Sequence, residues 1–220
     1  MDHDVYEHYT ALELIHWAWE KYGSGLTFAS SFGKEDLVIL DLLMRHHPQV
    51  DIFFLDTDLH FQETYGTISR LETHYGRTFT RVKPFLSLKE QTLRHGEALW
   101  SRDPDFCCNL RKVEPLKKYL SSFSAWITGI RREQSPTRAH MKKVEWDRKF
   151  QLVKMNPLVD WTEKEVWSYI MERNLPYNPL HDRNYPSIGC AVCTRPVKQG
   201  EGMRSGRWSG FNKVECGLHQ

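Results

Sequence analysis

The sequence has no long hydrophobic run. No stretch approaches the roughly 20 apolar residues that a membrane-spanning helix needs. The first residues, MDHDVYEHYT, also lack the basic segment and apolar core of a secretory signal. We therefore expect a cytoplasmic protein with no membrane partner.

A strong excess of one charge is missing as well. The chain has 30 Lys and Arg against 28 Asp and Glu, a formal net charge of +2, which is too small to argue for non-specific nucleic-acid binding. It has no internal repeat or low-complexity segment. At 220 residues, 40% of them hydrophobic and 26% charged, it has the composition of one globular domain with a functional extension.

Hydrophobic periodicity predicts alternating helices and strands. A Thr-x-x-Glu capping box at Thr162 and Glu165 marks the start of one helix. We expect helices at 5–22, 37–47, 61–76 and 162–174, and strands at 26–30, 51–56, 78–84, 124–130 and 151–158. From about residue 174 the chain is rich in Pro, Gly and Arg, which indicates loops wrapped on the domain.

Strands separated by helices predict an α/β fold with a parallel sheet and helices on both faces. Ligands of such sheets bind beyond the carboxyl ends of the strands. The segments SSFGKED (30–36) and DTDLHF (56–61) each follow a strand directly and should lie there.

The first of these segments turns from a strand into a helix N-terminus. Its free backbone N–H groups and the helix dipole suit a phosphate or sulfate. It lacks the G-x-x-x-x-G-K-[ST] pattern of a Walker loop, and its spacing fits an ordinary turn with a serine cap equally well. The candidate binding residues are Ser30, Ser31, Phe32, Gly33, Lys34 and Asp36.

The second segment carries Asp56 and Thr57. A carboxylate at this position could accept hydrogen bonds from a ribose or an adenine amino group. The same residues could instead only cap the helix that follows.

Cysteine is scarce, and its number is odd. Two of the five cysteines are adjacent, Cys107 and Cys108, and two form a C-x-x-C, Cys190 and Cys193. Four thiolates without histidine suit a structural zinc or an iron-sulfur cluster, and the adjacent pair favours a cluster because zinc ligands usually lie two to four residues apart. A buried pair beside a redox C-x-x-C is the alternative.

The fifth cysteine, Cys216, lies in a locally basic C-terminal segment. Nearby cations favour the thiolate form that attacks, so Cys216 is the candidate nucleophile, and His219 could act as a proton donor. A free surface cysteine without a function is the alternative interpretation.

Arginines gather in two other motifs. Guanidinium groups bind phosphate and sulfate oxygens in bidentate geometry, and several on one rim would neutralise a dianion. Each one could also be a solvated surface residue. The candidates are Arg131, Arg132 and Arg138 in TGIRREQSPTR, and Arg204 and Arg207 in GMRSGRW.

Several blocks together carry a family resemblance over nearly the whole chain. They are SSFGKEDLVILDLL, LDTDLHFQETY, CCNLRKVEPL, WITGIRREQSPTR, NPLVDWTEKEVW, LPYNPLHDRNYPSIGCAVCTRPV, GRW and ECGLH. In this order they resemble the assimilatory adenylyl-sulfate (APS) reductases, relatives of the phosphoadenylyl-sulfate (PAPS) reductases.

The resemblance implies a Rossmann-like fold of the adenine nucleotide alpha hydrolase type. It implies that APS is reduced to sulfite and AMP in sulfate assimilation and cysteine biosynthesis. The four paired cysteines would bind one 4Fe-4S cluster, with Lys112 between cluster and substrate. Cys216 would attack the sulfate sulfur to give an S-sulfocysteine, and thioredoxin or glutaredoxin would release the sulfite.

These expectations divide the chain into a nucleotide- and cluster-binding domain, 1–200, and a mobile catalytic tail, 201–220. Use of PAPS, alone or beside APS, stays open. So do an ATP-using adenylyl transferase of the same fold and a non-catalytic redox sensor, although the sensor would leave Cys216 unused. The sequence does not determine whether the chain forms a homo-oligomer.

Overall fold

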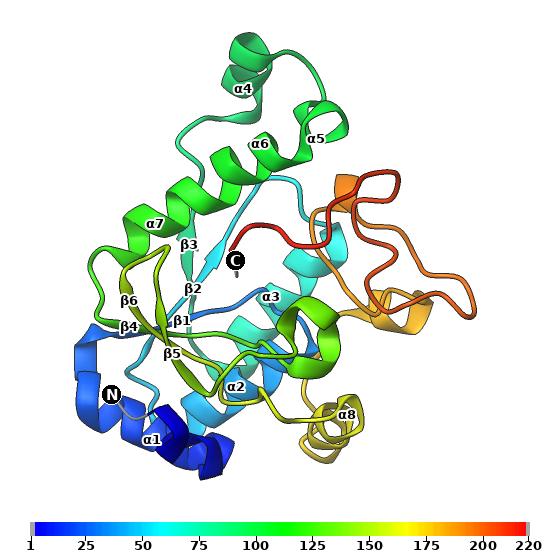
Figure 1. Ribbon diagram of the computed structural model, residues 1–220. Helices are drawn as coiled ribbons and strands as arrows, with labels where there is room; N and C mark the ends of the chain where they lie inside the picture. The colour runs from blue at the N-terminus through cyan, green and yellow to red at the C-terminus, as the bar shows by residue number, and fades with distance from the viewer. Residues whose placement is uncertain (1–2, 219–220) are drawn as a thin grey trace.

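A computed structural model describes residues 3–218, with side chains from residue 5 onward, and contains a six-stranded sheet (Figure 1). The strands are β1 (Leu26–Ala29), β2 (Asp51–Leu55), β3 (Thr80–Val82), β4 (Ala125–Ile127), β5 (Val144–Asp147) and β6 (Leu152–Met155). Their order is β3-β2-β1-β4-β6-β5, and only β5 is antiparallel to its neighbour.

Eight α-helices occur in the described part of the chain. They are α1 (Ala11–Tyr22), α2 (Lys34–His46), α3 (Gln62–Tyr75), α4 (Leu88–His95), α5 (Leu99–Arg102), α6 (Pro104–Cys108), α7 (Glu114–Leu120) and α8 (Glu163–Glu172). A π-helix, η3 (Asn109–Val113), joins α6 to α7. The 3₁₀ helices are η1 (His3–His8), η2 (Gly23–Gly25), η4 (Arg132–Gln134), η5 (Pro136–Arg138), η6 (Pro179–Arg183) and η7 (Ala191–Cys193).

Helices cover both faces of the sheet, as predicted. Successive strand residues point to opposite faces, so Phe54 packs in the core formed with α1, α2, α3 and α8, while its neighbour Phe53 packs against α7. The α/β fold prediction is confirmed.

The predicted elements are present with small shifts, and some elements were missed. The helix expected at 5–22 is interrupted, because a capping box of Thr10 and Glu13 starts α1 at Ala11. Helices α4 to α7 and the short edge strand β5 were not predicted. The capping box at Thr162 is confirmed.

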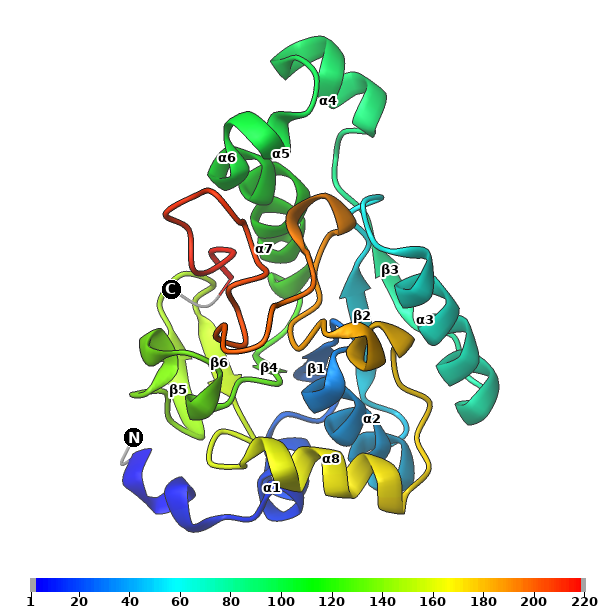
Figure 2. The same ribbon diagram turned by 90° about the vertical axis from the view of Figure 1, so that its right-hand side faces the viewer.

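Strand β1 lies between β2 and β4. Strands β2 and β3 are added on one side of β1, and β4, β6 and β5 lie on the other side. The connections that follow β1 and β4 therefore lead toward opposite edges of the sheet, and a crevice opens at the carboxyl ends of these strands. Figure 2 shows the C-terminal segments, in orange and red, on the side toward which β2 points. Within residues 3–218, no helix is both long and apolar enough to cross a membrane.

The C-terminal segment packs on the domain in this structure. Arg195 N–H donates to the Gly206 carbonyl at 2.9 Å, and Trp208 N–H donates to the Cys193 carbonyl at 3.0 Å. Trp208 is 3% exposed. The predicted boundary at residue 200 and the mobility of the tail stay predictions.

Candidate active site

A pocket of about 210 Å³ opens at the carboxyl ends of β1 and β4. Residues 29–36, the end of β4, residues 181–189 and the C-terminal segment line it, together with residues of β2, of 60–68 and of 112–116. Gly129 allows close approach of two of them, because a Cβ atom there would overlap the Asp36 carboxylate. The pocket therefore lies where the topology predicts a ligand.

The turn after β1 is held by its own polar groups. The Ser31 N–H and hydroxyl donate to Asp36 Oδ2 at 2.5 and 2.7 Å, and Phe32 takes a positive φ of 56°. Burial raises the pKa of Asp36 to about 7, although the hydrogen bonds from Ser31 act in the opposite direction. All six predicted residues of this turn line the pocket.

Lys34 ties the turn to other walls. Its Nζ donates to Glu163 Oε1 at 2.5 Å and to the Pro186 carbonyl at 3.4 Å, and its side chain is 2% exposed. The ammonium group thus links the start of α2 to the start of α8 and to the 181–189 segment.

The five predicted arginines separate into two groups. Arg138, Arg204 and Arg207 line the pocket. Arg131 does not: it is buried and donates to Glu35 Oε1 at 2.9 Å.

Arg132 does not line the pocket either, because its Nη2 pairs with Glu7 at 2.6 Å. In this structure, Arg131 and Arg132 connect elements of the fold.

Glu215 joins the tail to two pocket arginines. Arg138 donates to both carboxylate oxygens at 2.8 and 2.7 Å, and Arg204 donates at 3.2 Å. Burial would raise the pKa of Glu215, but the hydrogen bonds and charge of these arginines lower it below the ordinary 4.5. Sequence analysis missed Glu215, although an acidic residue next to Cys216 in a basic segment could have indicated it.

Cys216 and Leu218 bring the tail to the pocket, which both of them line. Lys149 Nζ donates to the Gly217 carbonyl at 2.6 Å and holds the end of the described tail. Cys216 lies within electrostatic range of Lys112 and Arg204. The predicted proton donor His219 lies outside the described residues.

The other four cysteines gather beside this pocket. Cys107 and Cys108 end α6, and Cys190 and Cys193 bracket η7. Burial and the neighbouring thiols raise the pKa of Cys107 to about 12 and that of Cys193 to about 11.

Cys190 differs from them, because Lys112 and the Thr57 hydroxyl, 3.3 Å from its sulfur, lower its pKa despite burial.

The donor chemistry fits an iron-sulfur cluster. A single metal ion would need its sulfur ligands about 2.3 Å from one point, and among residues 3–218 no group of three or more His, Cys, Asp or Glu could hold one. A 4Fe-4S cluster binds each thiolate to a different iron atom, so its four sulfurs lie further apart. The four cysteines are buried or half-buried thiols in mutual electrostatic contact.

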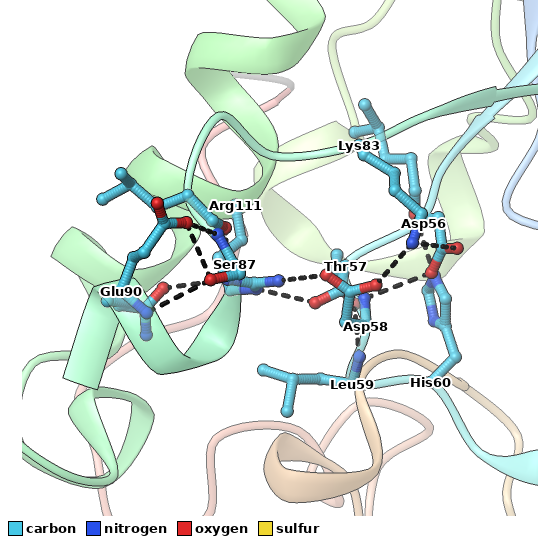
Figure 3. A network of polar contacts seen from close by, with 12 residues as sticks. Asp56, Thr57, Asp58, Leu59, His60, Lys83, Ser87, Glu90 and Arg111 are labelled. Atoms are coloured by element: carbon cyan, nitrogen blue, oxygen red, sulfur yellow. Dashed lines mark hydrogen bonds and ion pairs between the residues drawn. The ribbon is translucent and has the colours of Figure 1, made fainter. Parts of the chain in front are cut away.

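The π-helix after Cys108 sends adjacent side chains to different places. Arg111 donates to the Thr57 carbonyl at 2.6 Å and to Asp58 Oδ2 at 2.7 Å. Figure 3 shows its side chain pointing toward the loop that contains Thr57 and Asp58. Lys112 instead lines the pocket. The thiols of Cys190 and Cys216 raise the pKa of Lys112, against the effect of burial.

Asp56 and Thr57 do not line the pocket, unlike the neighbouring Leu55. Asp56 accepts a hydrogen bond from the Tyr65 hydroxyl at 2.6 Å, and Thr57 contacts Cys190. His60, which sequence analysis missed, does line the pocket, with its Nε2 2.9 Å from the Leu55 carbonyl (Figure 3). The histidine two residues after Asp58, in a segment that follows a strand, could have indicated it.

Comparisons with known proteins indicate one family. Residues 25–196 match the phosphoadenosine phosphosulfate reductase domain. The chain is 51% identical over 210 residues to the adenosine 5'-phosphosulfate reductase of Geobacillus thermodenitrificans (strain NG80-2), covering 95% of this chain and 89% of that protein. Adenosine 5'-phosphosulfate reductase 2 of Bacillus subtilis (strain 168) is 50% identical with the same coverage.

A solved structure supports the fold. The phosphoadenylyl-sulfate reductase of Candida auris, in a phosphate complex, superposes with a TM-score of 0.78 and 32% identity, covering 87% of this chain and 95% of that chain.

Proposed function

The chain belongs to the phosphoadenosine phosphosulfate reductase domain family, and from that premise we propose that it is an adenylyl-sulfate reductase of sulfate assimilation. It reduces APS to sulfite and AMP in the cytoplasm, with thioredoxin or glutaredoxin as the reductant. The observation that carries the proposal is Cys216, a thiol in the same pocket as Lys112 and three arginines.

The first chemical step is a displacement at sulfur. The Cys216 thiolate attacks the sulfate sulfur of APS, a sulfur–sulfur bond forms, and the bond from sulfur to the bridging phosphate oxygen breaks. AMP leaves with that oxygen, and Cys216 carries an S-sulfo group. Both reactants are anionic, so the cations of Arg204, Arg207 and Lys112 offset their repulsion and stabilise the leaving phosphate.

The second step needs an external dithiol. One thiolate of thioredoxin attacks the sulfur of Cys216, and sulfite leaves with the electron pair of the broken bond. The second thioredoxin thiol then releases Cys216 from the mixed disulfide, so the dithiol supplies both electrons. His219 would supply a proton to a leaving group in this proposal.

The cluster site is formed by Cys107, Cys108, Cys190 and Cys193. When bound, a 4Fe-4S cluster would supply structural order and a local charge distribution, since a two-electron thiol exchange needs no electron relay. The chain's own part is to hold Lys112 within electrostatic range of Cys108, Cys190 and Cys216.

APS is the substrate that the relatives favour. The two bacterial relatives, at about 50% identity, are named for it, while the 32% identical Candida auris protein is a phosphoadenylyl-sulfate reductase. We therefore propose APS as the preferred substrate.

The test is turnover of APS and PAPS by protein purified without oxygen, with reduced thioredoxin and with sulfite and AMP as measured products. We expect sulfite and AMP in equal amounts from APS, and slower turnover of PAPS. Release of pyrophosphate from ATP without sulfite formation would support an adenylyl transferase instead. No turnover of any of these compounds by cluster-loaded protein would favour a redox sensor.

A further inference from the structure

Arg207 differs from the other two arginines of the pocket in its partners. Those two share the Glu215 carboxylate, at 2.7 and 3.2 Å. Within the described residues, Arg207 donates to neutral oxygens alone: its Nη1 lies 3.2 Å from Ser187 Oγ and 3.5 Å from the Ile188 carbonyl. No carboxylate of these residues offsets its charge, so an anion that enters the pocket can pair with it.

Gly189 leaves the space in which the Arg207 guanidinium lies. Both residues line the pocket, and a Cβ atom at Gly189 would overlap Nη2 and Cζ of Arg207. These atoms are the end of a flexible side chain. A methyl group at residue 189 would therefore move the cation and leave the backbone in place.

Trp208 contacts the same guanidinium. Its ring centroid lies 4.5 Å from Arg207 Cζ, which is a cation–π distance. Trp208 is buried and has a φ of 46°, a left-handed conformation that bulky residues rarely adopt. Such a conformation persists only where the surrounding contacts impose it, and it is most common at functional sites.

Both contacts are anchored in the segment that carries the C-x-x-C. Gly189 directly precedes this motif, and Trp208 N–H donates to the Cys193 carbonyl at 3.0 Å. The backbone of Arg207 forms an antiparallel bridge with Thr194. The guanidinium is therefore held against this segment rather than by the end of the tail.

We propose that Gly189 and Trp208 are positioning residues that hold the Arg207 guanidinium at the pocket, where it binds an anionic oxygen of the nucleotide. Gly189 supplies the space, and Trp208 supplies the aromatic face. The inference rests on the proposed function, because it takes the pocket to be an adenine nucleotide site. The anionic oxygen belongs either to the phosphate or to the sulfate of APS, and the test separates the two.

The experiment measures the affinities of adenosine, AMP and ADP by calorimetry at pH 7.5, on cluster-loaded protein purified without oxygen. The AMP-to-adenosine affinity ratio reports the contribution of the 5'-phosphate. The ADP-to-AMP ratio reports that of a second anionic group in place of the sulfate. Arg207→Gln removes the charge and should lower one of these ratios more than about tenfold. A general folding defect would weaken all three ligands and leave both ratios unchanged.

The positioning variants should lower the same ratio. We expect a loss of about tenfold for Gly189→Ala, which displaces the guanidinium, and of about fivefold for Trp208→Leu, which removes the cation–π contact. Trp208→Phe keeps an aromatic face and should retain most of the ratio. Gly202→Ala is the matched control, with both ratios unchanged, since nothing lies within 4 Å of a Cβ atom there.

A second comparison tests whether the two residues act through Arg207. In the Arg207→Gln background, neither Gly189→Ala nor Trp208→Leu should change the ratios further. A further loss in that background, or an unchanged ratio in either single variant, would overturn the inference alone. Unchanged ratios in Arg207→Gln would overturn it too, because Arg207 would then bind no anion. Absence of AMP and ADP binding to the wild type would overturn the proposed function, and the inference with it.

Discussion

The pocket has a sheet-side wall, formed by residues 30–36 and 128–130, and a tail-side wall, formed by residues 203–208 and 216–218. Main-chain bonds hold the first: Ser30 N–H donates to the Phe53 carbonyl and Thr128 N–H to the Met155 carbonyl, both at 2.9 Å. In the second wall, main-chain bonds hold residues 206 and 208 to residues 195 and 193, but the hydrogen bonds of residues 212–218 to other described segments all involve a side chain.

The difference indicates what each wall can do. Main-chain bonds between strands break only when the sheet opens, so the sheet-side wall is a permanent binding surface. Ion pairs such as Glu215 with Arg138, or Lys213 with Asp105, can be released while the sheet stays folded. A tail attached in this way suits a thiol that must meet first a nucleotide and then a protein partner.

Removing the nucleophile of the tail-side wall should have the largest effect on activity. Cys216→Ser should lower sulfite formation from APS more than about 1000-fold, because a hydroxyl is a far weaker nucleophile than a thiolate. Cluster absorbance and AMP affinity should stay within twofold of the wild type, because neither depends on the thiol. Retained turnover would refute the assignment of Cys216.

A substitution in the sheet-side wall should affect folding instead. Gly129→Ala places a methyl group against the buried Asp36 carboxylate and should lower the melting temperature by roughly 5–10 °C. Gly202→Ala is the matched control in the tail, since nothing lies within 4 Å of a Cβ atom there. Equal melting temperatures for the two variants would show that the close approach at Gly129 is not needed.

Glu215→Gln should loosen the tail and leave the sheet folded. It removes the carboxylate shared by Arg138 and Arg204, and we expect roughly tenfold faster proteolysis within residues 201–220 at an unchanged melting temperature. Glu201→Gln is the control, because its partner Arg195 lies on the same exposed segment. A similar proteolysis rate in both variants would contradict the role of Glu215.

Acid should act on the same contact in the wild type. The pKa of Glu215 is lowered by folding, so its contribution is complete above the ordinary value of 4.5 and is lost as pH falls through the lowered value. Proteolysis of the wild-type tail, measured with an acid-active protease, should rise below pH 4.5, whereas Glu215→Gln should lack this rise.

Local signals were sufficient for much of the fold. The capping box at Thr162 marks the start of α8 correctly, and a similar Ser-x-x-Glu pattern at Ser87 and Glu90 marks the start of α4. Strand β5 was harder to find, because it is an edge strand of four residues with an exposed Trp146. Short edge strands carry little periodicity, so their pairing depends on the neighbouring strand.

Local sequence patterns did not predict which arginines line the pocket. Arg131, Arg132 and Arg138 lie within one motif, yet only Arg138 reaches the pocket. Arg131 pairs with Glu35, which is 96 residues away in the chain, and Arg132 with Glu7. A guanidinium group on a long side chain finds its partner through tertiary contacts, which motif spacing does not specify.

By itself, the sequence determined the alternation of strands and helices, the turn after β1 and the family. These features depend on periodicity, turn chemistry and residue order, which are local properties of the chain. Only the tertiary structure decided which cations line the pocket and that Glu215 attaches the tail. Those properties depend on burial and on partners distant in the chain, and both arise only when the chain has folded.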